Sequence, residues 1–392
     1  MEHLINSRVK DIQVSGIRKF SNLVASTPGA ISLTLGQPDF PTPEHVKEAA
    51  KRALDANKTT YTHNAGIVPL RQAAARFIQD RYNLPAYDPE TEVIVTNGAS
   101  QAIDITLRTI LVEGTEVILP GPIYPGYEPI IRLCGATPLL VDTRETGFKL
   151  TADGIRAHLT DKTRCVILPY PSNPTGYVLE EQDLQEIADL LRDKDVFVLS
   201  DEIYSELIYD RPHVSISTFP GMREKTVVIN GLSKSHSMTG WRIGFTFAPK
   251  YLSQQMIKVH QYEVSCASSI SQQAALEALT AGVDDALPMR DEYHKRRDYC
   301  YDRLLAMGLE LPGKPEGAFY LFPSIRHTGQ TSLEFATGLL HEEKVAVVPG
   351  DAFSPLGEGY VRLSYAYSME VLQEALDRME RYVRRLLADT NN

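Results

Sequence analysis

Three polar side chains in the middle of the chain have types and positions suited to holding one reactive cofactor. Lys234 lies in GLSKSHSMTGWRIGF, directly after the apolar run TVVIN (Thr226–Asn230), and Arg242 lies in the same segment. A lysine next to a core is costly unless its ammonium is paired or loses its proton. Asp201 follows the apolar run VFVLS, where a buried carboxylate needs cations or hydrogen-bond donors. A Schiff base to Lys234 and a ring nitrogen beside Asp201 would meet both needs.

Further polar residues follow neighbouring apolar runs. Asn173 lies in the rigid turn PYPSNPTGY, and Asn97-Gly98-Ala99-Ser100 leads into a helix whose free N–H groups suit a phosphate. Arg242 can offer a bidentate fork to such a group. Each residue also has a structural interpretation: Asp201 as the N-cap of a helix EIYSEL, Asn173 as a turn former, and Arg242 as a surface ion pair.

Taken together, these residues match the needs of one ligand. A pyridine cofactor with a phosphate needs a lysine for its aldehyde, a carboxylate for its ring nitrogen and donors for its phenolate oxygen. It also needs an aromatic face, and a helix end with an arginine for the phosphate. The sequence therefore predicts pyridoxal 5'-phosphate (PLP), held by Lys234, Asp201, Asn173 with Tyr204, Tyr124, and Ala99-Ser100 with Arg242.

Other site chemistries have little support in the sequence. No GxGxxG occurs, and GLELPGK (Gly308–Lys314) resembles a P-loop but is followed by Pro315 in place of Ser or Thr. His, Cys and carboxylates show no zinc-like spacing, and GxSxG is absent.

The elements that must position these residues are predicted from apolar patterns. ETEVIVTNG (Glu90–Gly98) predicts a strand, and Ser100–Leu111 has the apolar spacing of a helix. TEVILPGP, TRCVILPYP, VFVLSDE and TVVINGLSK each end an apolar run in a polar or Pro/Gly turn, as parallel strands covered by helices do. Open α/β sheets bind ligands at the carboxyl ends of their strands, where the polar residues fall.

The rest of the chain predicts a smaller α+β unit. SISQQAALEALTAG and DEYHKRRDYCYDRLLAMG have the pattern of amphipathic helices, and GAFYLFP and EGYVRLSYA that of strands. SLTLGQPDFPTP is too rich in Pro and Gly for a regular element. We expect an N-terminal arm with part of the small domain over 1–42, a large cofactor-binding domain over 43–280, and a small domain with a long connecting helix over 281–392.

Composition disfavours several partners and cellular locations. The net charge of -10 argues against nucleic acid or an anionic membrane as a partner. No apolar run is long enough for a transmembrane helix, and the N-terminus lacks the apolar core of a signal peptide. Four scattered cysteines predict free thiols and a cytoplasmic protein.

GLSKSHSMTGWRIGF resembles the PLP-lysine signature of class I (fold type I) aminotransferases, and SNPTG, SDEIY, TNGASQA and YVRLSYA resemble other blocks of that family in its order. The resemblance spans essentially the whole chain. It implies an α/β fold with a large domain, built on a mixed, mostly parallel sheet covered by helices, plus a smaller α+β domain. It also implies cis bonds at Asn173–Pro174 and Gly121–Pro122.

The resemblance assigns a role to each site residue. Lys234 would form the Schiff base and then move the proton between the substrate α-carbon and the cofactor. Asp201 would pair with the ring nitrogen, Asn173 and Tyr204 with the ring oxygen, and Tyr124, where relatives often have Trp or Phe, would stack on the ring. The implied phosphate contacts are Ala99, Ser100, Ser233, Arg242 and, from the other subunit of a homodimer, Tyr61. Arg362 would clamp the substrate α-carboxylate, with Gly36 against the same group.

The implied reaction is transamination by a ping-pong route between an amino acid and a 2-oxo acid, with 2-oxoglutarate as the expected acceptor. LPGPIYPGYEPII, VLSDEIYSELIYDRPH and NGLSKSHSMTGWRIGF are similar to the bacterial subfamily that acts on N-acetyl-L,L-diaminopimelate in lysine biosynthesis. Aspartate or aromatic amino acid aminotransferases are alternatives, although no distal arginine can be assigned for a second carboxylate. A PLP-dependent Cβ lyase and a non-catalytic module of a DNA-binding regulator are further rivals. The acidic chain, with no room for a helix-turn-helix, disfavours the regulator.

Overall fold

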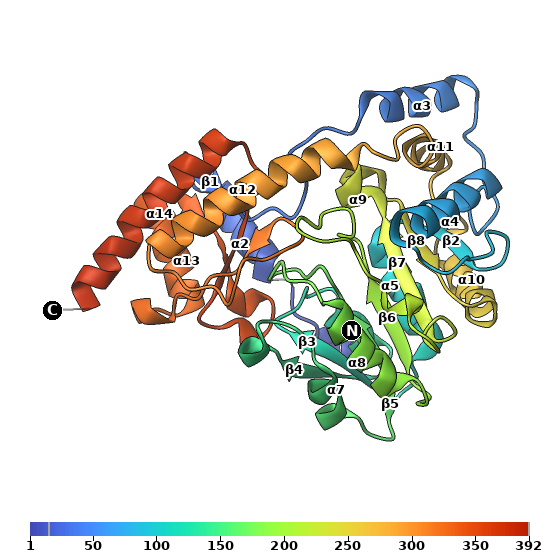
Figure 1. Cartoon of the computed structure of the whole chain (residues 1–392), viewed down its shortest axis with the longest axis horizontal. Coiled ribbons are helices and arrows are strands. Elements are labelled where there is room, and N and C mark those ends of the chain that lie inside the picture. Colours follow the sequence, from blue (N-terminus) through green and yellow to red (C-terminus); the bar gives the residue numbers. More distant parts are fainter. Residues whose placement is uncertain (15, 391–392) are drawn as a thin grey trace.

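The computed structural model describes residues 1–14 and 16–390. Its largest sheet has seven strands in the order β2-β8-β7-β6-β5-β3-β4 (Figure 1). The strands are β2 (Val93–Thr96), β3 (Glu116–Gly121), β4 (Thr137–Asp142), β5 (Thr163–Leu168), β6 (Phe197–Asp201), β7 (Thr226–Gly231) and β8 (Gly244–Phe247). Only β8 runs antiparallel to its neighbours; the other pairs are parallel, which confirms the mostly parallel sheet.

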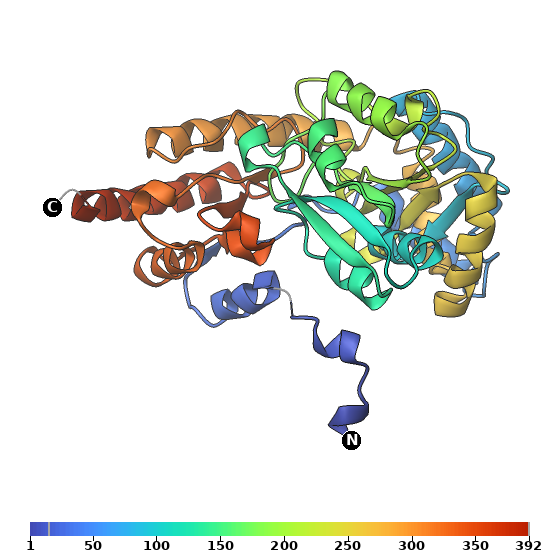
Figure 2. The same cartoon turned by 90° about the horizontal axis from the view of Figure 1, so that it is seen from below.

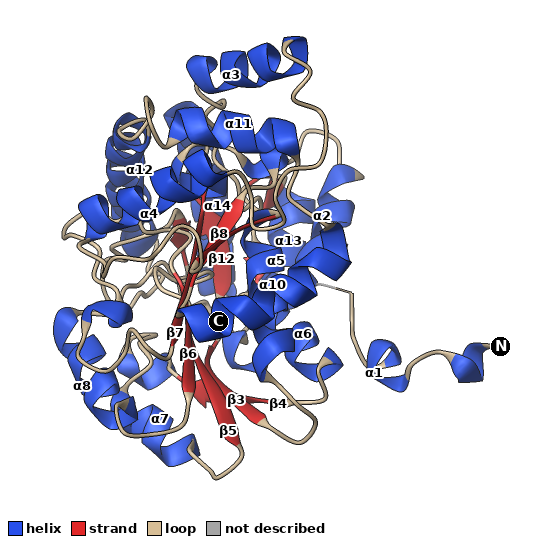
Figure 3. Cartoon of the chain, turned by 90° about the vertical axis from the view of Figure 1, so that its right-hand side faces the viewer, coloured by secondary structure: helices blue, strands red, loops and turns tan. Residues whose placement is uncertain are grey.

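Helices cover both faces of this sheet, so its strands are apolar on both sides (Figure 3). Along β6, Leu199 packs with α5, α6 and α10, while Val198 packs with α7 and α8. Helices α4 and α11 pack on the same face of the sheet as α7 and α8, and α3 packs against α11 on the outer side. These helices are α3 (Glu44–Asp55), α4 (Val68–Tyr82), α5 (Gly98–Ile110), α6 (Tyr127–Leu133), α7 (Ala152–His158), α8 (Glu181–Leu191), α10 (Lys250–Val264) and α11 (Ser269–Ala278).

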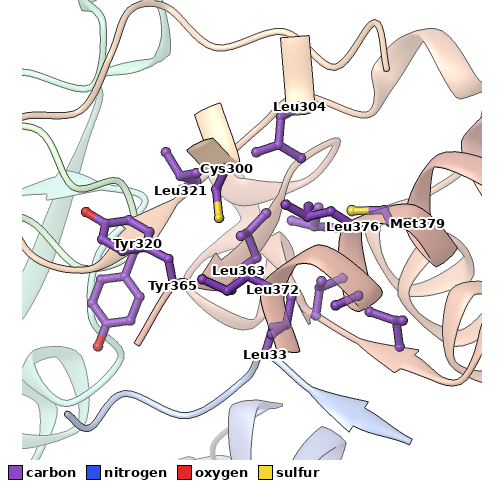
Figure 4. Close-up of a cluster of buried hydrophobic side chains, with 14 of the residues drawn as sticks. Leu33, Cys300, Leu304, Tyr320, Leu321, Leu363, Tyr365, Leu372, Leu376 and Met379 are labelled. Atoms are coloured by element: carbon purple, nitrogen blue, oxygen red, sulfur yellow. The ribbon is translucent and has the colours of Figure 1, made fainter. Parts of the chain in front are cut away.

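A smaller unit lies beside the sheet, built from C-terminal elements and one N-terminal strand (Figure 1). Its helices are α12 (Ala286–Ala306), α13 (Ser332–Glu343) and α14 (Met369–Thr390). Its strands are β9 (Tyr320–Leu321), β11 (Val348–Pro349) and β12 (Val361–Ser364) in one antiparallel sheet, and β10 (Val345–Ala346) paired in parallel with β1 (Ile31–Ser32). Leu33 enters the apolar core between α12, β12 and α14 (Figure 4), so the segment around β1 packs with this unit.

The remaining helical elements are short, apart from α2. Figure 2 shows the first residues of the chain projecting away from its body. These elements are η1 (Glu2–Leu4), α1 (Ser7–Lys10), α2 (Gly16–Ala25), η2 (Arg144–Thr146), η3 (Ile216–Thr218), α9 (Leu232–Ser235), η4 (Thr239–Trp241), η5 (Arg326–Thr328), η6 (Gly350–Ala352) and η7 (Pro355–Gly357).

We propose that the domains divide at 42/43 and 280/281, because all strands of the seven-stranded sheet lie between these points.

Three X–Pro peptide bonds of the described residues are cis. Gly121–Pro122 and Asn173–Pro174 are cis, as predicted, and Tyr170–Pro171 is cis as well, which the sequence did not predict. The interpretation of Asp201 as a helix N-cap is wrong, because residues 203–206 form a turn that ends without a helix. In the described residues no helix is both long enough and apolar enough to cross a bilayer. The four cysteines are free, as expected.

Candidate functional site

One edge of the seven-stranded sheet collects polar side chains from distant parts of the sequence. Asp201 ends β6 and Lys234 follows β7, and these two strands are parallel neighbours. Because β8 runs antiparallel to β7 and β2, Arg242 before β8 reaches the same edge as Gly98 after β2. The reversed direction of β8 therefore brings Arg242, which precedes its strand, to the same end of the sheet as Lys234 and Gly98, which follow theirs.

A cavity of about 370 Å³ opens at this edge, within the size range of small-molecule sites. Every predicted site residue except Tyr61 lines it: Gly36, Ala99, Ser100, Tyr124, Asn173, Asp201, Tyr204, Ser233, Lys234, Arg242 and Arg362. The side chain of Tyr61 is 87% exposed and does not line the cavity of its own chain.

Lys234 lines this cavity from the short helix α9. Its Nζ donates a hydrogen bond of 2.5 Å to the carbonyl oxygen of Gly36, and it lies 5.8 Å from the ring centre of Tyr204. Burial lowers the pKa of Lys234 to about 8, and the positive charges of Arg362 and Arg242 add to that effect. A large fraction of this amine is therefore neutral near pH 8, as a nucleophile or general base requires.

Asp201 is buried at the end of β6 with two hydrogen-bond donors. The hydroxyl of Tyr127 donates to Oδ2 at 2.6 Å, and the backbone N–H of Ile203 donates to Oδ1 at 3.2 Å. Burial raises the pKa of Asp201 to about 6, against the opposing effect of the two donors and of Lys234. The carboxylate is thus mostly ionised at neutral pH and suited to a cationic partner.

Arg362 is buried on β12 and only partly paired. It donates to Asn173 Oδ1 at 2.8 Å and to the carbonyl oxygen of Thr34 at 2.6 Å, while its Nε has no hydrogen-bond partner. Its guanidinium lies 4.4 Å from the ring centre of Tyr320 and 4.9 Å from that of Phe353. A buried arginine that lines a cavity suits a carboxylate ligand, because its terminal nitrogens carry further N–H donors.

Tyr204 and Asn173 line the same cavity as Lys234. The hydroxyls of Tyr204 and Tyr320 are 2.8 Å apart, which links the large sheet to the small unit. Asn173 uses its carbonyl oxygen to accept from Arg362, so its side-chain N–H₂ group is left to donate to a ligand.

The opposite end of the cavity is suited to an anion. Helix α5 begins at Gly98 and points its first N–H groups into the region lined by Ala99, Ser100 and Arg242. Arg242 adopts a left-handed backbone conformation with φ of 56°, and donates to the carbonyl oxygen of Thr239 at 3.0 Å. Gly98 has φ of 74°, and a Cβ built there would lie within 2.3 Å of an Arg242 side-chain nitrogen.

The close approach of Gly98 to Arg242 gives a test of the anion end. Gly98→Ala adds strain of about 1–2 kcal/mol and also displaces Arg242. Gly114→Ala is the matched control, because Gly114 has φ of 81° but nothing within 4 Å of its added Cβ. We expect both variants to lose similar thermal stability, and only Gly98→Ala to bind PLP about tenfold more weakly or worse in spectrophotometric titration. Equal PLP affinity in the two variants would contradict this picture of Arg242.

The cavity fits PLP in its donor chemistry. It offers a neutralisable amine at Lys234, a buried carboxylate at Asp201, donors at Asn173 and Tyr204, and an anion end at α5 and Arg242. Within residues 1–14 and 16–390 no group of three or more His, Cys, Asp or Glu is placed to hold a metal ion. Sequence reasoning missed Tyr127, Tyr320 and Thr34; only their contacts identify them, because each lies in an ordinary apolar or loop segment.

An open α/β sheet with a lysine, an aspartate and an anion-binding helix end at one edge defines a PLP-dependent transferase of fold type I. Comparison with known proteins gives the family. The family model described as aminotransferase class I and II matches residues 28–379. The chain is 63% identical over 383 residues to a Bacillus subtilis protein described as a probable N-acetyl-LL-diaminopimelate aminotransferase, covering 98% of this chain and 96% of the relative.

Solved structures agree with this assignment. The aromatic aminotransferase of Pyrococcus horikoshii superposes with a TM-score of 0.88 at 44% identity, covering 94% of this chain and all of that one. The aspartate aminotransferase of Thermus thermophilus with maleate superposes with a TM-score of 0.89 at 37% identity, covering 96% and 99% of the two chains. This chain belongs to the class I and II aminotransferases. It is an aminotransferase that uses PLP, and its substrates are an amino acid and a 2-oxo acid.

Proposed function

We propose that this enzyme transfers the amino group of N-acetyl-L,L-diaminopimelate to 2-oxoglutarate, giving glutamate and the corresponding 2-oxo acid, by a reversible ping-pong route, as a step of lysine and diaminopimelate biosynthesis. The observation that carries the proposal is the 63% identity, over nearly both full chains, to the Bacillus subtilis relative described by that substrate. Aspartate and aromatic amino acid aminotransferases are the second candidates, because relatives with those descriptions are 44% and 43% identical over 97% of this chain.

We assign the cavity residues as follows. Arg362 binds the substrate α-carboxylate with Gly36 beside it, and Lys234 attaches the cofactor and then acts as the base that takes the substrate α-proton. PLP, when bound, supplies the electron sink for the electrons that this proton leaves behind. Asp201 keeps the ring nitrogen protonated, and Asn173 and Tyr204 donate to the ring oxygen. Tyr124 stacks on the ring, and the phosphate contacts are Ala99, Ser100, Ser233 and Arg242.

Contacts of the cavity support these roles. Arg362 and Lys234 line the same cavity, so a carboxylate bound by Arg362 would hold the α-carbon near the amine. Arg362, Arg242 and Lys234 are the only cationic side chains among the described residues of this chain that line the cavity. All three have roles already, which leaves no arginine of this chain for a second carboxylate. Aspartate, N-acetyl-L,L-diaminopimelate and 2-oxoglutarate all carry a second carboxylate, so the preference among donors is left to the panel below.

A donor panel tests the proposed substrate. Purified enzyme is given N-acetyl-L,L-diaminopimelate, aspartate or an aromatic amino acid with 2-oxoglutarate, and glutamate formation is measured. We expect kcat/KM for the acetylated donor to exceed the others by about tenfold or more, which is about 1.4 kcal/mol of preference. Faster turnover of aspartate or an aromatic amino acid would assign one of the second candidates. Amino acid breakdown without use of the 2-oxo acid would instead indicate a Cβ lyase.

We also propose a homodimer in which Tyr61 reaches the phosphate end of the partner subunit's site. Support comes from the way the chain holds this exposed tyrosine in place. Beside it, Gln272 donates to the Thr62 hydroxyl at 2.9 Å, and Asn64 donates to the carbonyl oxygen of Ser265 at 2.8 Å. An exposed ring on an anchored loop is preorganised for a partner. Light scattering should give twice the chain mass, and a monomeric mass in active enzyme would refute the dimer.

The proposed location is the cytoplasm. Four cysteines remain free thiols, and Cys165 and Cys300 are buried where burial raises each thiol pKa to about 12. Free thiols of this kind are typical of a reducing compartment. Cell fractionation with an antibody to the chain would test this, and recovery of the protein outside the cytoplasmic fraction would contradict it.

A further inference from the structure

Tyr127 makes a contact that the assigned roles leave unexplained. It begins α6, its side chain is only 2% exposed, and its hydroxyl donates to Asp201 Oδ2 at 2.6 Å. Its ring also meets that of Tyr124 edge to face, with centres 5.8 Å apart. The residue therefore lies between the proposed stacking ring and the proposed partner of the cofactor nitrogen.

A buried carboxylate faces two opposing demands. Burial favours the protonated form, but a partner for a pyridinium must be ionised. The N–H of Ile203 occupies Oδ1 and the hydroxyl of Tyr127 occupies Oδ2, so each oxygen has one donor and keeps lone pairs for a ligand. Burial and the neighbouring carboxylate raise the pKa of the Tyr127 hydroxyl well above its ordinary value, so it remains a donor throughout the working pH range.

We propose that Tyr127 is a positioning residue for transamination: its hydroxyl fixes the orientation of Asp201 and keeps that carboxylate charged for the cofactor nitrogen. The proposal rests on the proposed role of Asp201. Within this chain, the titratable groups whose charge acts on Asp201 come from its own loop, α6, the segment before α6 and α9: Glu202, Tyr204, Tyr127, Tyr124 and Lys234. Glu202 works against ionisation, whereas Lys234 and the Tyr127 hydrogen bond favour it.

Loss of the Tyr127 hydroxyl is expected to raise the pKa of Asp201. In the wild type, burial raises the pKa of Asp201 to about 6, and the two hydrogen bonds and Lys234 limit that rise. Tyr127→Phe removes a contribution that lowers this pKa, so the midpoint of ionisation must rise. A hydrogen bond to a charged acceptor corresponds to about one to two pH units. At neutral pH the variant then holds a largely protonated Asp201, which no longer attracts a cationic ring.

The test uses the full chain freed of its cofactor. Infrared difference spectra, with Asp201→Asn as the subtraction that identifies the band, give the pH midpoint of the Asp201 carboxyl. We expect Tyr127→Phe to raise that midpoint by about one unit or more and to weaken PLP binding at pH 7 by about tenfold. Tyr127→Gln, which restores a neutral N–H donor, is expected to recover part of both effects.

The matched control is Tyr82→Phe. The Tyr82 hydroxyl also donates to a buried carboxylate, Glu206 Oε1, at 2.6 Å, so the same hydroxyl and the same type of bond are lost away from the cavity. This control should leave the Asp201 midpoint and the PLP affinity unchanged. Equal midpoints in the wild type and Tyr127→Phe would overturn the proposal, and this result does not depend on the physiological donor, because no substrate is present. A shifted midpoint with unchanged PLP affinity would instead refute the role of Asp201.

Discussion

Lys234→Ala is expected to abolish transamination, with kcat falling by about 10⁴-fold or more. Both the attachment of the cofactor and the transfer of the substrate α-proton are assigned to its amine, and a positioned general base contributes about 10²–10⁴-fold even alone. The lowered pKa of about 8 and the contact with Gly36 place a partly neutral amine in the cavity that no other described lysine reaches. Steady-state kinetics and single-turnover loss of cofactor absorbance measure the effect.

The control separates chemistry from folding and from binding. Lys51→Ala removes an exposed lysine of α3 that pairs with Glu48 at 2.5 Å, and it should leave turnover and absorbance unchanged. Lys234→Ala should retain the wild-type thermal midpoint within a few degrees in cofactor-free protein, since a buried ammonium is itself costly. It should lose the visible band of the lysine-linked cofactor. Near-normal turnover with that band retained would refute the assignment of Lys234.

Arg362→Lys is expected to reduce kcat/KM for both substrates by about 10²-fold or more. A lysine keeps the charge but loses the planar fork that binds a carboxylate through two parallel hydrogen bonds. Each charge-assisted hydrogen bond is worth about 1.5–3 kcal/mol, so the loss of one already gives a tenfold effect or greater. The loss should fall mainly on KM, because the α-carboxylate is bound in the ground state as well as during reaction.

Two further measurements make the Arg362 result specific. The amino acid and the 2-oxo acid share the α-carboxylate, so both half-reactions should weaken by a similar factor. PLP affinity should stay close to that of the wild type, because Arg362 lies at the substrate end of the cavity. Arg378→Lys on α14, whose side chain pairs with Glu374 at 2.7 Å, is the matched control and should behave as wild type. An effect on only one of the two substrates would contradict the assigned role.

Local sequence patterns predicted the main architecture because the relevant forces act over short stretches. The apolar runs before Asp201 and after Lys225 are strands β6 and β7, since continuous burial on two faces requires such runs. The helix after Asn97 and the long helix α12 were likewise visible from their apolar spacing. The alternative interpretation of Asp201 as a helix N-cap is wrong, because a local pattern does not distinguish a helix start from a turn: the segment after Asp201 is a turn, and the carboxylate accepts from Ile203 and Tyr127.

The sequence by itself determined which reactive groups this protein has and which family it belongs to: the lysine, aspartate and arginines lie in motifs specific enough to name a PLP-dependent aminotransferase. The tertiary structure alone decided how those groups are completed. Tyr127 reaches Asp201, Tyr320 reaches Tyr204, and Arg362 lines the same cavity as Lys234. Those contacts join positions far apart in the chain, through the parallel pairing of β3, β5 and β6 and the docking of the small unit. Such pairings depend on packing over the whole fold, which no local pattern encodes.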